Sequence, residues 1–323
     1  MAKSENQKLK ILYLLDILYS NTDLEKGITM SEILQKLERL GIRCERKSVY
    51  NDIFLLREDY GVDIELRKNG KTSEYYVGSR EFELSELRLL VDAVSASKFI
   101  TLKKSSQLIK KLESLTSENQ ARSLRSQVHV SGRIKTMNET IYISVDAINE
   151  AINKGRKISF KYFEWTPKGD KKLRRDGALY TVSPCMLCWE DENYYLVAAQ
   201  DDVIKHYRVD KMQDISVLGE KRTVPEAFDP ESYTSAVFGM YGGREETVTL
   251  HCHNSICGAV IDRFGKDIMM LPDADGFSIT QKIRISPQFF AWLCGFGKNI
   301  RITHPESVIS EFKKHIGEIA ENY

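Results

Sequence analysis

The chain has 323 residues, 42% of them apolar and 29% charged, with a formal net charge of +1 at pH 7. These values are ordinary for a globular protein of two or three domains, and they exclude a chain-wide electrostatic field as the basis of partner choice. No run of about 18 apolar residues occurs and MAKSENQKLK lacks the apolar core of a signal peptide, so we expect a cytoplasmic protein without a membrane partner.

The first eighty residues predict three short helices followed by a two-stranded hairpin. Apolar residues recur at helical spacing in KLKILYLLDILYSN, in MSEILQKLERLG and in the segment from Arg46 to Gly61. The dipeptide Asn69-Gly70 then separates two strand-like runs, as it does in tight hairpins. This order of elements is that of a winged helix-turn-helix, whose third helix enters the major groove of DNA.

Side chains suited to DNA gather at the start of the third helix and on the hairpin. Arginine and lysine reach phosphates or guanine, and asparagine pairs with adenine. The segment RKSVYNDI resembles the recognition helix of winged-helix regulators of bacteria, with Asn51 where relatives often carry a basic residue. The alternative is a set of solvated charges, because acidic and basic residues are nearly equal in number over residues 1–80. We predict double-stranded DNA as a partner, contacted by Arg46, Lys47, Ser48, Tyr50, Asn51, Arg67, Lys68 and Lys71.

Residues 81–144 predict a helical region that leads to the next domain. In FELSELRLLVDAVSASKFI an apolar stripe at helical spacing is formed by Leu87, Leu90, Val91 and Val94. The stripe could pack inside the chain or against a second copy, and two-fold proteins that read palindromic DNA need such a contact. We therefore expect a homodimer, with this region as its linker and dimerisation element.

From Val145 onward the sequence predicts one helix and then several short strands, an order typical of a small, strongly bent sheet or barrel. NYYLVAAQ has the composition of a buried strand. HYRVDKM alternates apolar and polar residues, so Tyr207 and Val209 would fill the barrel. His206, Arg208 and Asp210 would then face a groove outside the barrel.

This outside groove is the predicted ligand site. Arg208 could bind an anion through two parallel hydrogen bonds, and aromatic rings nearby could form a platform for a base. Two alternatives stay open: Arg208 could pair with Asp210, and Tyr194 could pack in the core. The predicted ligand-binding residues are Tyr180, Ser183, Tyr194, His206 and Arg208.

The run Tyr194-Tyr195-Leu196 resembles the signature of WYL domains, with tyrosine in place of the usual tryptophan. Pro184 stands where that family has an upstream proline, and YRVDKM resembles its downstream segment. WYL domains are Sm-like β-barrels of bacterial transcriptional regulators. The resemblance implies that residues 145–228 sense an anionic effector, a nucleotide or a single-stranded nucleic acid.

Residues 229–323 predict the order β-α-β-β-α-β, which is the ferredoxin-like pattern, and resemble the C-terminal extension of many WYL regulators. In SPQFFAWLCGFG, Ser286 is suited to cap a helix and Pro287 to begin it. Arg263, Arg284 and Arg301 could serve a ligand groove or a dimer contact, and their spacing does not select between these.

Metal and catalytic sites are not indicated. Cys185 and Cys188 lie three apart in an extended segment and so point to opposite faces, while the set His251, His253 and Cys257 lacks a fourth ligand at the usual spacing. No Walker A, HExxH, GxSxG or GxGxxG motif occurs. His206 and Asp210 could form a base and its orienter, but no nucleophile lies nearby in sequence. We expect no metal, no cofactor and no enzyme.

The sequence as a whole predicts a ligand-responsive, DNA-binding transcription regulator of the α+β multidomain class. The alternative is a non-enzymatic nucleic-acid-binding scaffold or stress-response adaptor without a small-molecule effector. The predicted domains are a winged helix-turn-helix (1–80), a helical linker (81–144), an Sm-like barrel (145–228) and a ferredoxin-like extension (229–323).

Overall fold

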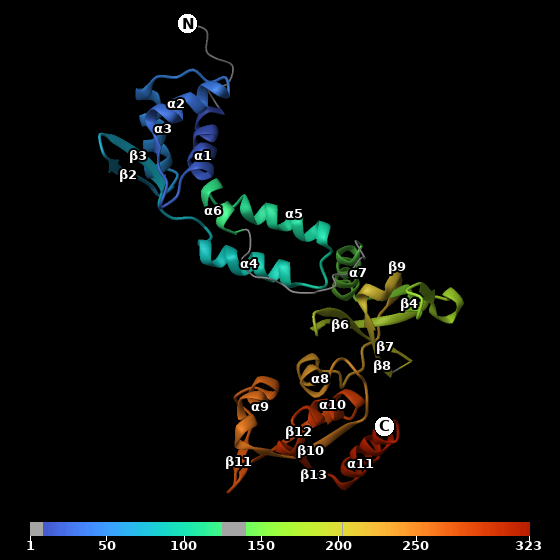
Figure 1. The fold of residues 1–323 in the computed structure, drawn as a ribbon. Coiled ribbons are helices and arrows are strands. Elements are labelled where there is room, and N and C mark those ends of the chain that lie inside the picture. Colours follow the sequence, from blue (N-terminus) through green and yellow to red (C-terminus); the bar gives the residue numbers. More distant parts are fainter. Residues whose placement is uncertain (1–8, 125–139, 202) are drawn as a thin grey trace. The chain divides into compact units, whose positions relative to one another are not determined.

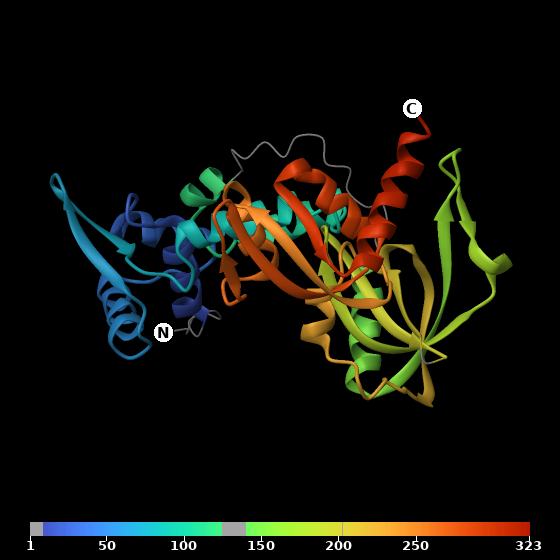
Figure 2. The same cartoon turned by 90° about the horizontal axis from the view of Figure 1, so that it is seen from below.

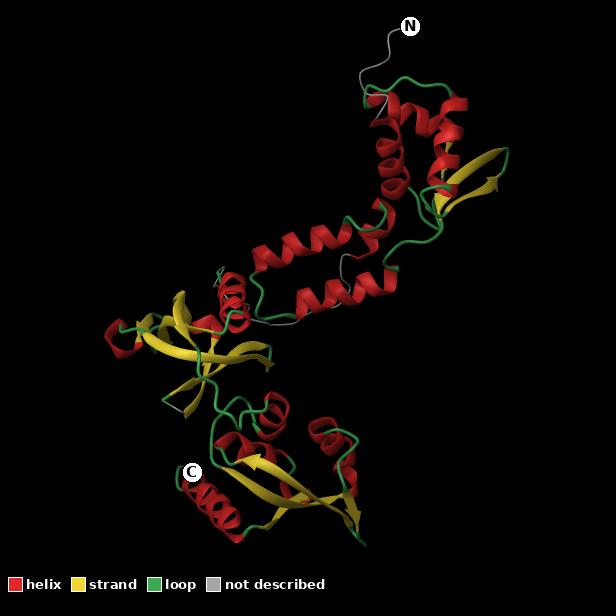
Figure 3. Cartoon of the chain, turned by 180° about the vertical axis from the view of Figure 1, so that it is seen from behind, coloured by secondary structure: helices red, strands yellow, loops and turns green. Residues whose placement is uncertain are grey.

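The structure, a computed structural model, describes residues 9–124, 140–201 and 203–323. The chain divides into two compact units, Met1–Glu139 and Thr140–Tyr323, and each is described by itself (Figure 1). Helices predominate in the first unit and most strands lie in the second (Figure 3). The boundary predicted between residues 144 and 145 lies close to this division, whereas the other two predicted boundaries fall inside the units.

The first unit opens with three helices and a three-stranded sheet in the order β1-β3-β2. Leu14, Leu37 and Val49 are fully buried where the helices meet, because the apolar residues of each helix share one face. A capping box between Thr29 and Glu32 begins the second helix. The β2–β3 hairpin projects from the helices (Figure 2). The elements are α1 (Lys10–Asn21), β1 (Ile28–Thr29), α2 (Met30–Arg39), α3 (Arg46–Glu58), β2 (Ile64–Asn69) and β3 (Thr72–Val77).

Three further helices complete the described part of this unit: α4 (Leu84–Ala96), α5 (Leu102–Glu113) and α6 (Glu118–Leu124). Of the predicted apolar stripe, Leu87 and Val91 are buried within the chain and Val94 is half-buried, whereas Leu90 is 39% exposed. Packing inside the chain therefore accounts for Leu87 and Val91, and the dimer contact stays a prediction.

A buried carboxylate ties the loop after α1 to the start of α6. Asp23 accepts hydrogen bonds from the Ser117 hydroxyl (2.5 Å), the Asn119 amide (3.3 Å) and the backbone N–H groups of Glu25 (2.9 Å) and Lys26 (2.8 Å). Burial acts to raise the pKa of Asp23, but these bonds outweigh it and hold the pKa below its ordinary value. The hydrogen-bonded Asp23 carboxylate thus connects the end of α1 to the start of α6.

The second unit begins with helix α7 and an antiparallel, curled sheet in the order β5-β4-β6-β7-β8, with β9 pairing with β4. Its interior holds an aromatic cluster in which the Phe160 and Tyr180 rings stack 5.5 Å apart and Tyr207 meets Phe160 edge-on at 5.1 Å. The elements are α7 (Ile141–Asn153), β4 (Arg156–Trp165), β5 (Lys171–Leu173), β6 (Tyr180–Glu190), β7 (Asn193–Gln200), β8 (Val203–Arg208) and β9 (Met212–Lys221).

The strand predicted over HYRVDKM is wrong beyond Arg208. Strand β8 ends there, Val209–Lys211 form a 3-10 turn, and β9 begins at Met212. NYYLVAAQ is confirmed as strand β7, and its central residues Leu196 and Val197 are fully buried on opposite faces.

The remainder of the second unit has the predicted β-α-β-β-α-β order followed by a last helix, with the sheet order β11-β12-β10-β13. The hydroxyl of Ser286 accepts a hydrogen bond from the Phe289 N–H, and Pro287 begins the helix, as the sequence predicts. The elements are α8 (Pro230–Ala236), β10 (Glu245–His253), α9 (Cys257–Phe264), β11 (Met270–Pro272), β12 (Gly276–Arg284), α10 (Pro287–Gly295), β13 (Ile300–His304) and α11 (Glu306–Ala320).

Candidate functional site

Helix α3 presents one exposed face. Val49, Asp52 and Ile53 are buried on one side of the helix, so Tyr50 and Asn51 point outward. Arg46, Lys47 and Asn51 are exposed, and Tyr50 is 48% exposed. Arg46 and Lys47 form no hydrogen bond or ion pair with any residue that the structure describes, so both cations are available to a partner.

The other face of α3 is held by a buried ion pair. The Lys10 ammonium of α1 lies 2.7 Å from the Asp52 carboxylate, and the two side chains are 8% and 12% exposed. Lys10 also donates to the Ser48 hydroxyl. Ser48 is half-buried and its hydroxyl is engaged by Lys10, so its predicted contact with DNA stays a prediction.

The hairpin offers two free cations and one that is engaged. Lys68 and Lys71 are exposed and have no partner within the described ranges. Arg67 instead uses all three guanidinium nitrogens, toward the Glu74 carboxylate (3.3 Å) and the carbonyl oxygens of Leu24 (2.8 Å) and Glu25 (2.7 Å). Arg67 is therefore corrected from a DNA contact to an anchor between the hairpin and the loop after α1.

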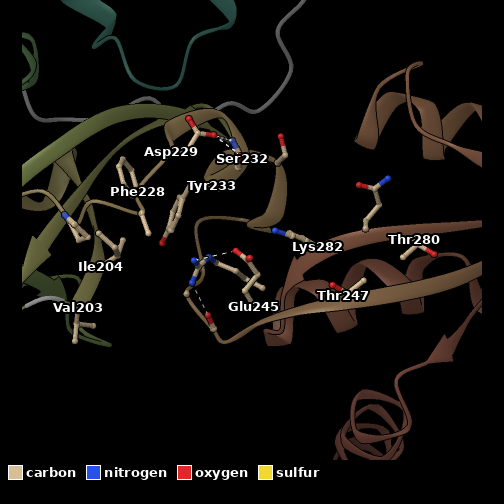
Figure 4. A pocket seen from close by; sticks show the side chains of 17 residues that line it. Val203, Ile204, Phe228, Asp229, Ser232, Tyr233, Glu245, Thr247, Thr280 and Lys282 are labelled. Atoms are coloured by element: carbon tan, nitrogen blue, oxygen red, sulfur yellow. Dashed lines mark hydrogen bonds and ion pairs between the residues drawn. The ribbon is translucent and has the colours of Figure 1, made fainter.

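The second unit contains a cavity of about 1110 Å³. Its walls come from the edge of β8, from α8 and the segment before it, and from β10 and β12 (Figure 4). Phe228 and Tyr233 provide aromatic surface, with ring centres 5.2 Å apart. Lys282 extends from β12 toward α8, and hydroxyl groups of α8 and both strands complete a mixed polar and apolar lining.

Two cations, Lys282 and Arg284, and two carboxylates, Asp229 and Glu245, line the cavity. The Asp229 carboxylate accepts from the Ser232 N–H at 2.8 Å and caps α8, and these bonds with Ser232 lower the pKa of Asp229. Arg284 pairs with Glu245 at 3.5 Å. Lys282 is exposed and forms no ion pair with a described side chain, and the Asp229 carboxylate likewise has no described cation beside it.

Tyr233 contacts both Arg284, through its ring, and His206, through its hydroxyl. The Arg284 guanidinium lies over the Tyr233 ring, 4.6 Å from its centre, and donates to the Gly243 carbonyl at 3.0 Å. Its buried Nε–H finds no acceptor in the described part of the chain. The Tyr233 hydroxyl forms a 2.8 Å hydrogen bond with His206 Nε2.

His206 is held neutral at pH 7. Burial, and then the charge of Arg284, lower its pKa from 6.5 to about 4. The folded chain therefore binds this proton less readily than the unfolded chain does. The stabilisation is fully present above about pH 6.5 and is lost as the pH falls toward 4.

We expect the second unit to lose on the order of 3 kcal/mol of unfolding free energy through this window, and His206→Gln to abolish that loss. Tryptophan fluorescence during denaturant unfolding measures it, because all three tryptophans lie in the second unit. A His206→Gln variant with an unchanged pH profile would assign the loss to other groups.

Comparison with known proteins identifies one family in the second unit. Residues 144–217 match the family model described as WYL domain. These residues form a WYL domain. No curated protein matches the chain. Within the described residues, no helix combines the length and the hydropathy needed to cross a membrane.

Two solved structures align with most of the chain at low similarity. "Proteasome accessory factor B/C (PafBC) of Arthrobacter aurescens" aligns at 18% identity with a TM-score of 0.28, over 99% of this chain and 49% of that chain. A CRISPR Cas-related protein aligns at 14% identity with a TM-score of 0.35, over 90% and 77%. The chain thus spans about half the length of the first structure, and similarity at this level supports no conclusion about its function.

The WYL domain does not bring the predicted ligand residues together. Arg208 donates to both carboxylate oxygens of Asp210 (3.0 and 2.9 Å) and to the Asn193 side-chain oxygen (2.8 Å). Its place in a ligand groove is therefore corrected to the alternative of a structural pair. The 3-10 turn that ends β8 folds Asp210 back onto Arg208.

The other predicted ligand residues of the WYL domain are also engaged. Tyr180 is corrected to a core residue, because it is buried in the aromatic cluster with the Arg175 guanidinium over its ring at 4.4 Å. Ser183 is buried and accepts from the Thr223 N–H at 3.0 Å. Tyr194 packs edge-on against Trp189 at 4.7 Å. His206 alone reaches the cavity wall, through its bond to Tyr233.

Sequence reasoning missed most of the cavity. Helix α8 has a recognisable start, because Asp229 caps it and Pro230 occupies its first position. Lys282 and Arg284 are two residues apart on β12 and so share a face. The described residues hold no group of three histidine, cysteine or acidic side chains placed to bind a metal ion.

Proposed function

We propose that the protein is a non-enzymatic, ligand-responsive regulator of transcription that binds double-stranded DNA through its first unit. The cavity beside the WYL domain binds an anionic effector of the nucleotide class, either free or as part of a single strand. The proposal includes a homodimer, because a symmetric operator is bound by two copies of the DNA-binding domain.

The exposed face of α3 is the observation that carries the DNA-binding part. Arg46 and Lys47 stand free at the start of a helix whose other side is fixed in the core, and Lys68 and Lys71 extend the positive surface along the hairpin. A helix of this kind fits the major groove of DNA, while a hairpin beside it contacts the phosphate backbone of the duplex.

The effector site is supported by its combination of groups. The Lys282 ammonium is a donor without an acceptor in the described part of the chain, and Phe228 and Tyr233 are rings on which a base can stack. A phosphate and a base need these two kinds of surface in one cavity.

We expect Lys282→Gln to weaken binding of nucleoside monophosphates about tenfold or more, because a charge-assisted hydrogen bond contributes roughly 1.5–3 kcal/mol. Calorimetric titration of the full-length protein measures this, with inorganic phosphate as the reference ligand. Lys298→Gln is the matched control, since Lys298 is exposed outside the cavity. Equal affinities for all three proteins would remove Lys282 from the site, and absence of nucleotide binding by the unaltered protein would favour the scaffold alternative, which has no effector.

A further inference from the structure

A hairpin of the WYL domain carries dense positive charge that the effector cavity does not use. It consists of the end of β4, a turn over residues 166–170, and β5, and it projects from the curled sheet (Figure 2). The hairpin and the turn that follows it, residues 164–176, contain five cations and three carboxylates, those of Glu164, Asp170 and Asp176. The five cations are Lys168, Lys171, Lys172, Arg174 and Arg175.

The hairpin is a well-formed ribbon. Trp165 pairs with Lys171 across the two strands, and the turn is closed by a 2.9 Å hydrogen bond from the Thr166 N–H to the Asp170 carbonyl. Neighbouring residues of a strand face opposite sides, so Lys171 and Lys172 place charge on both faces. Lys168 adds a third charge at the turn.

The three lysines of this hairpin form no ion pair with any carboxylate that the structure describes. Arg174 is the engaged member, because it donates to the Glu164 carboxylate at 2.9 Å. Lys168 and Lys172 are exposed and have no partner within the described ranges. Lys171 lies 4.6 Å from the centre of the Phe163 ring, and Arg175 covers Tyr180. A cation that lies over a ring is ordered there without being neutralised.

The surface fits a polyanion better than a folded protein. Protein interfaces are anchored by buried aromatic and aliphatic side chains, and the ribbon offers only Trp165, which is 49% exposed and packs edge-on against Phe163. A two-stranded ribbon fits the major groove of B-DNA, and lysine is a common phosphate ligand. The geometry points to the phosphodiester backbone of double-stranded DNA as the ligand of this hairpin.

The test is a triple variant of the full-length protein, Lys168→Gln, Lys171→Gln and Lys172→Gln. We expect weaker binding to a long duplex of arbitrary sequence, with the slope of log affinity against log salt reduced by about 0.9 for each phosphate that the variant no longer neutralises. The matched control is Lys298→Gln, Lys313→Gln and Lys314→Gln, which removes the same charge from exposed positions elsewhere in the second unit. Circular dichroism and tryptophan fluorescence verify the fold of both.

The same triple variant in an Arg46→Ala, Lys47→Ala background separates this inference from the proposed function. A further loss of duplex binding there supports the role of the hairpin whether or not the α3 substitutions have an effect of their own. Wild-type affinity and salt slope in the triple variant would overturn it. A loss confined to a labelled single-stranded oligonucleotide would overturn the duplex assignment and identify a single strand as the ligand.

Discussion

An Arg46→Ala, Lys47→Ala variant will bind duplex DNA roughly 5- to 150-fold more weakly than the unaltered protein, corresponding to about 1–3 kcal/mol. Both side chains are exposed at the first turn of α3 and have no partner in the described part of the chain. If each binds a phosphate, the slope of log affinity against log salt will fall by about 2. Fluorescence anisotropy with a labelled duplex at several salt concentrations measures both quantities.

The matched control for this experiment is Lys110→Ala, Lys111→Ala. These two lysines are exposed in the last turn of α5, in the same unit, so the change in charge is identical and only its position differs. The assignment of α3 as the DNA-reading helix requires the two variants to differ. Identical affinities and salt slopes would remove it, together with the proposed function that depends on it.

The exposed face of α3 could be predicted from sequence because the apolar periodicity defines the buried one. Val49, Ile53 and Leu56 recur at helical spacing and pack inward, so Lys47, Tyr50 and Asn51 lie on the exposed side. Ser48 shows the limit of this reasoning. It borders the buried stripe, and its hydroxyl is used by Lys10, a residue 38 positions earlier that no local pattern connects to it.

The error at Arg208 has a different physical origin. An alternating pattern correctly assigns Tyr207 to the interior and Arg208 to the opposite face of β8. In a continuous strand Asp210 and Arg208 would lie on the same face with their side chains parallel, so the carboxylate would not fold back onto the guanidinium. The 3-10 turn at Val209–Lys211 instead brings the Asp210 carboxylate onto the guanidinium, and alternation alone does not reveal where a strand stops.

The cavity could not be predicted because its walls are distant in sequence. Val203 and Ile204 from β8, Tyr233 from α8 and Lys282 from β12 meet only when the second sheet and α8 pack beside the WYL domain. Helix α8 covers the outer face of β7, where Val197 packs with Tyr233. A strand buried on both faces reads as a continuous apolar run, but such a run does not identify what covers it.

The ion pair between Lys10 and Asp52 predicts a second large effect. We expect Lys10→Met to lower the unfolding free energy of the first unit by about 3–5 kcal/mol, because it leaves the buried Asp52 carboxylate without its counter-charge. Loss of the pair also frees α3 from α1, so duplex binding will weaken in parallel. The first unit contains no tryptophan, so its unfolding is followed by far-ultraviolet circular dichroism, while tryptophan fluorescence reports the second unit.

The double variant Lys10→Met, Asp52→Leu tests whether the unpaired Asp52 carboxylate causes this loss of stability. Replacing both charges by apolar side chains removes the cost of the uncompensated carboxylate, so its stability will return to near that of the unaltered protein. The midpoint measured by tryptophan fluorescence will stay the same in all three proteins. If the double variant is as unstable as Lys10→Met, then Lys10 stabilises the unit through its own packing and its bond to Ser48, and the pairing with Asp52 contributes little.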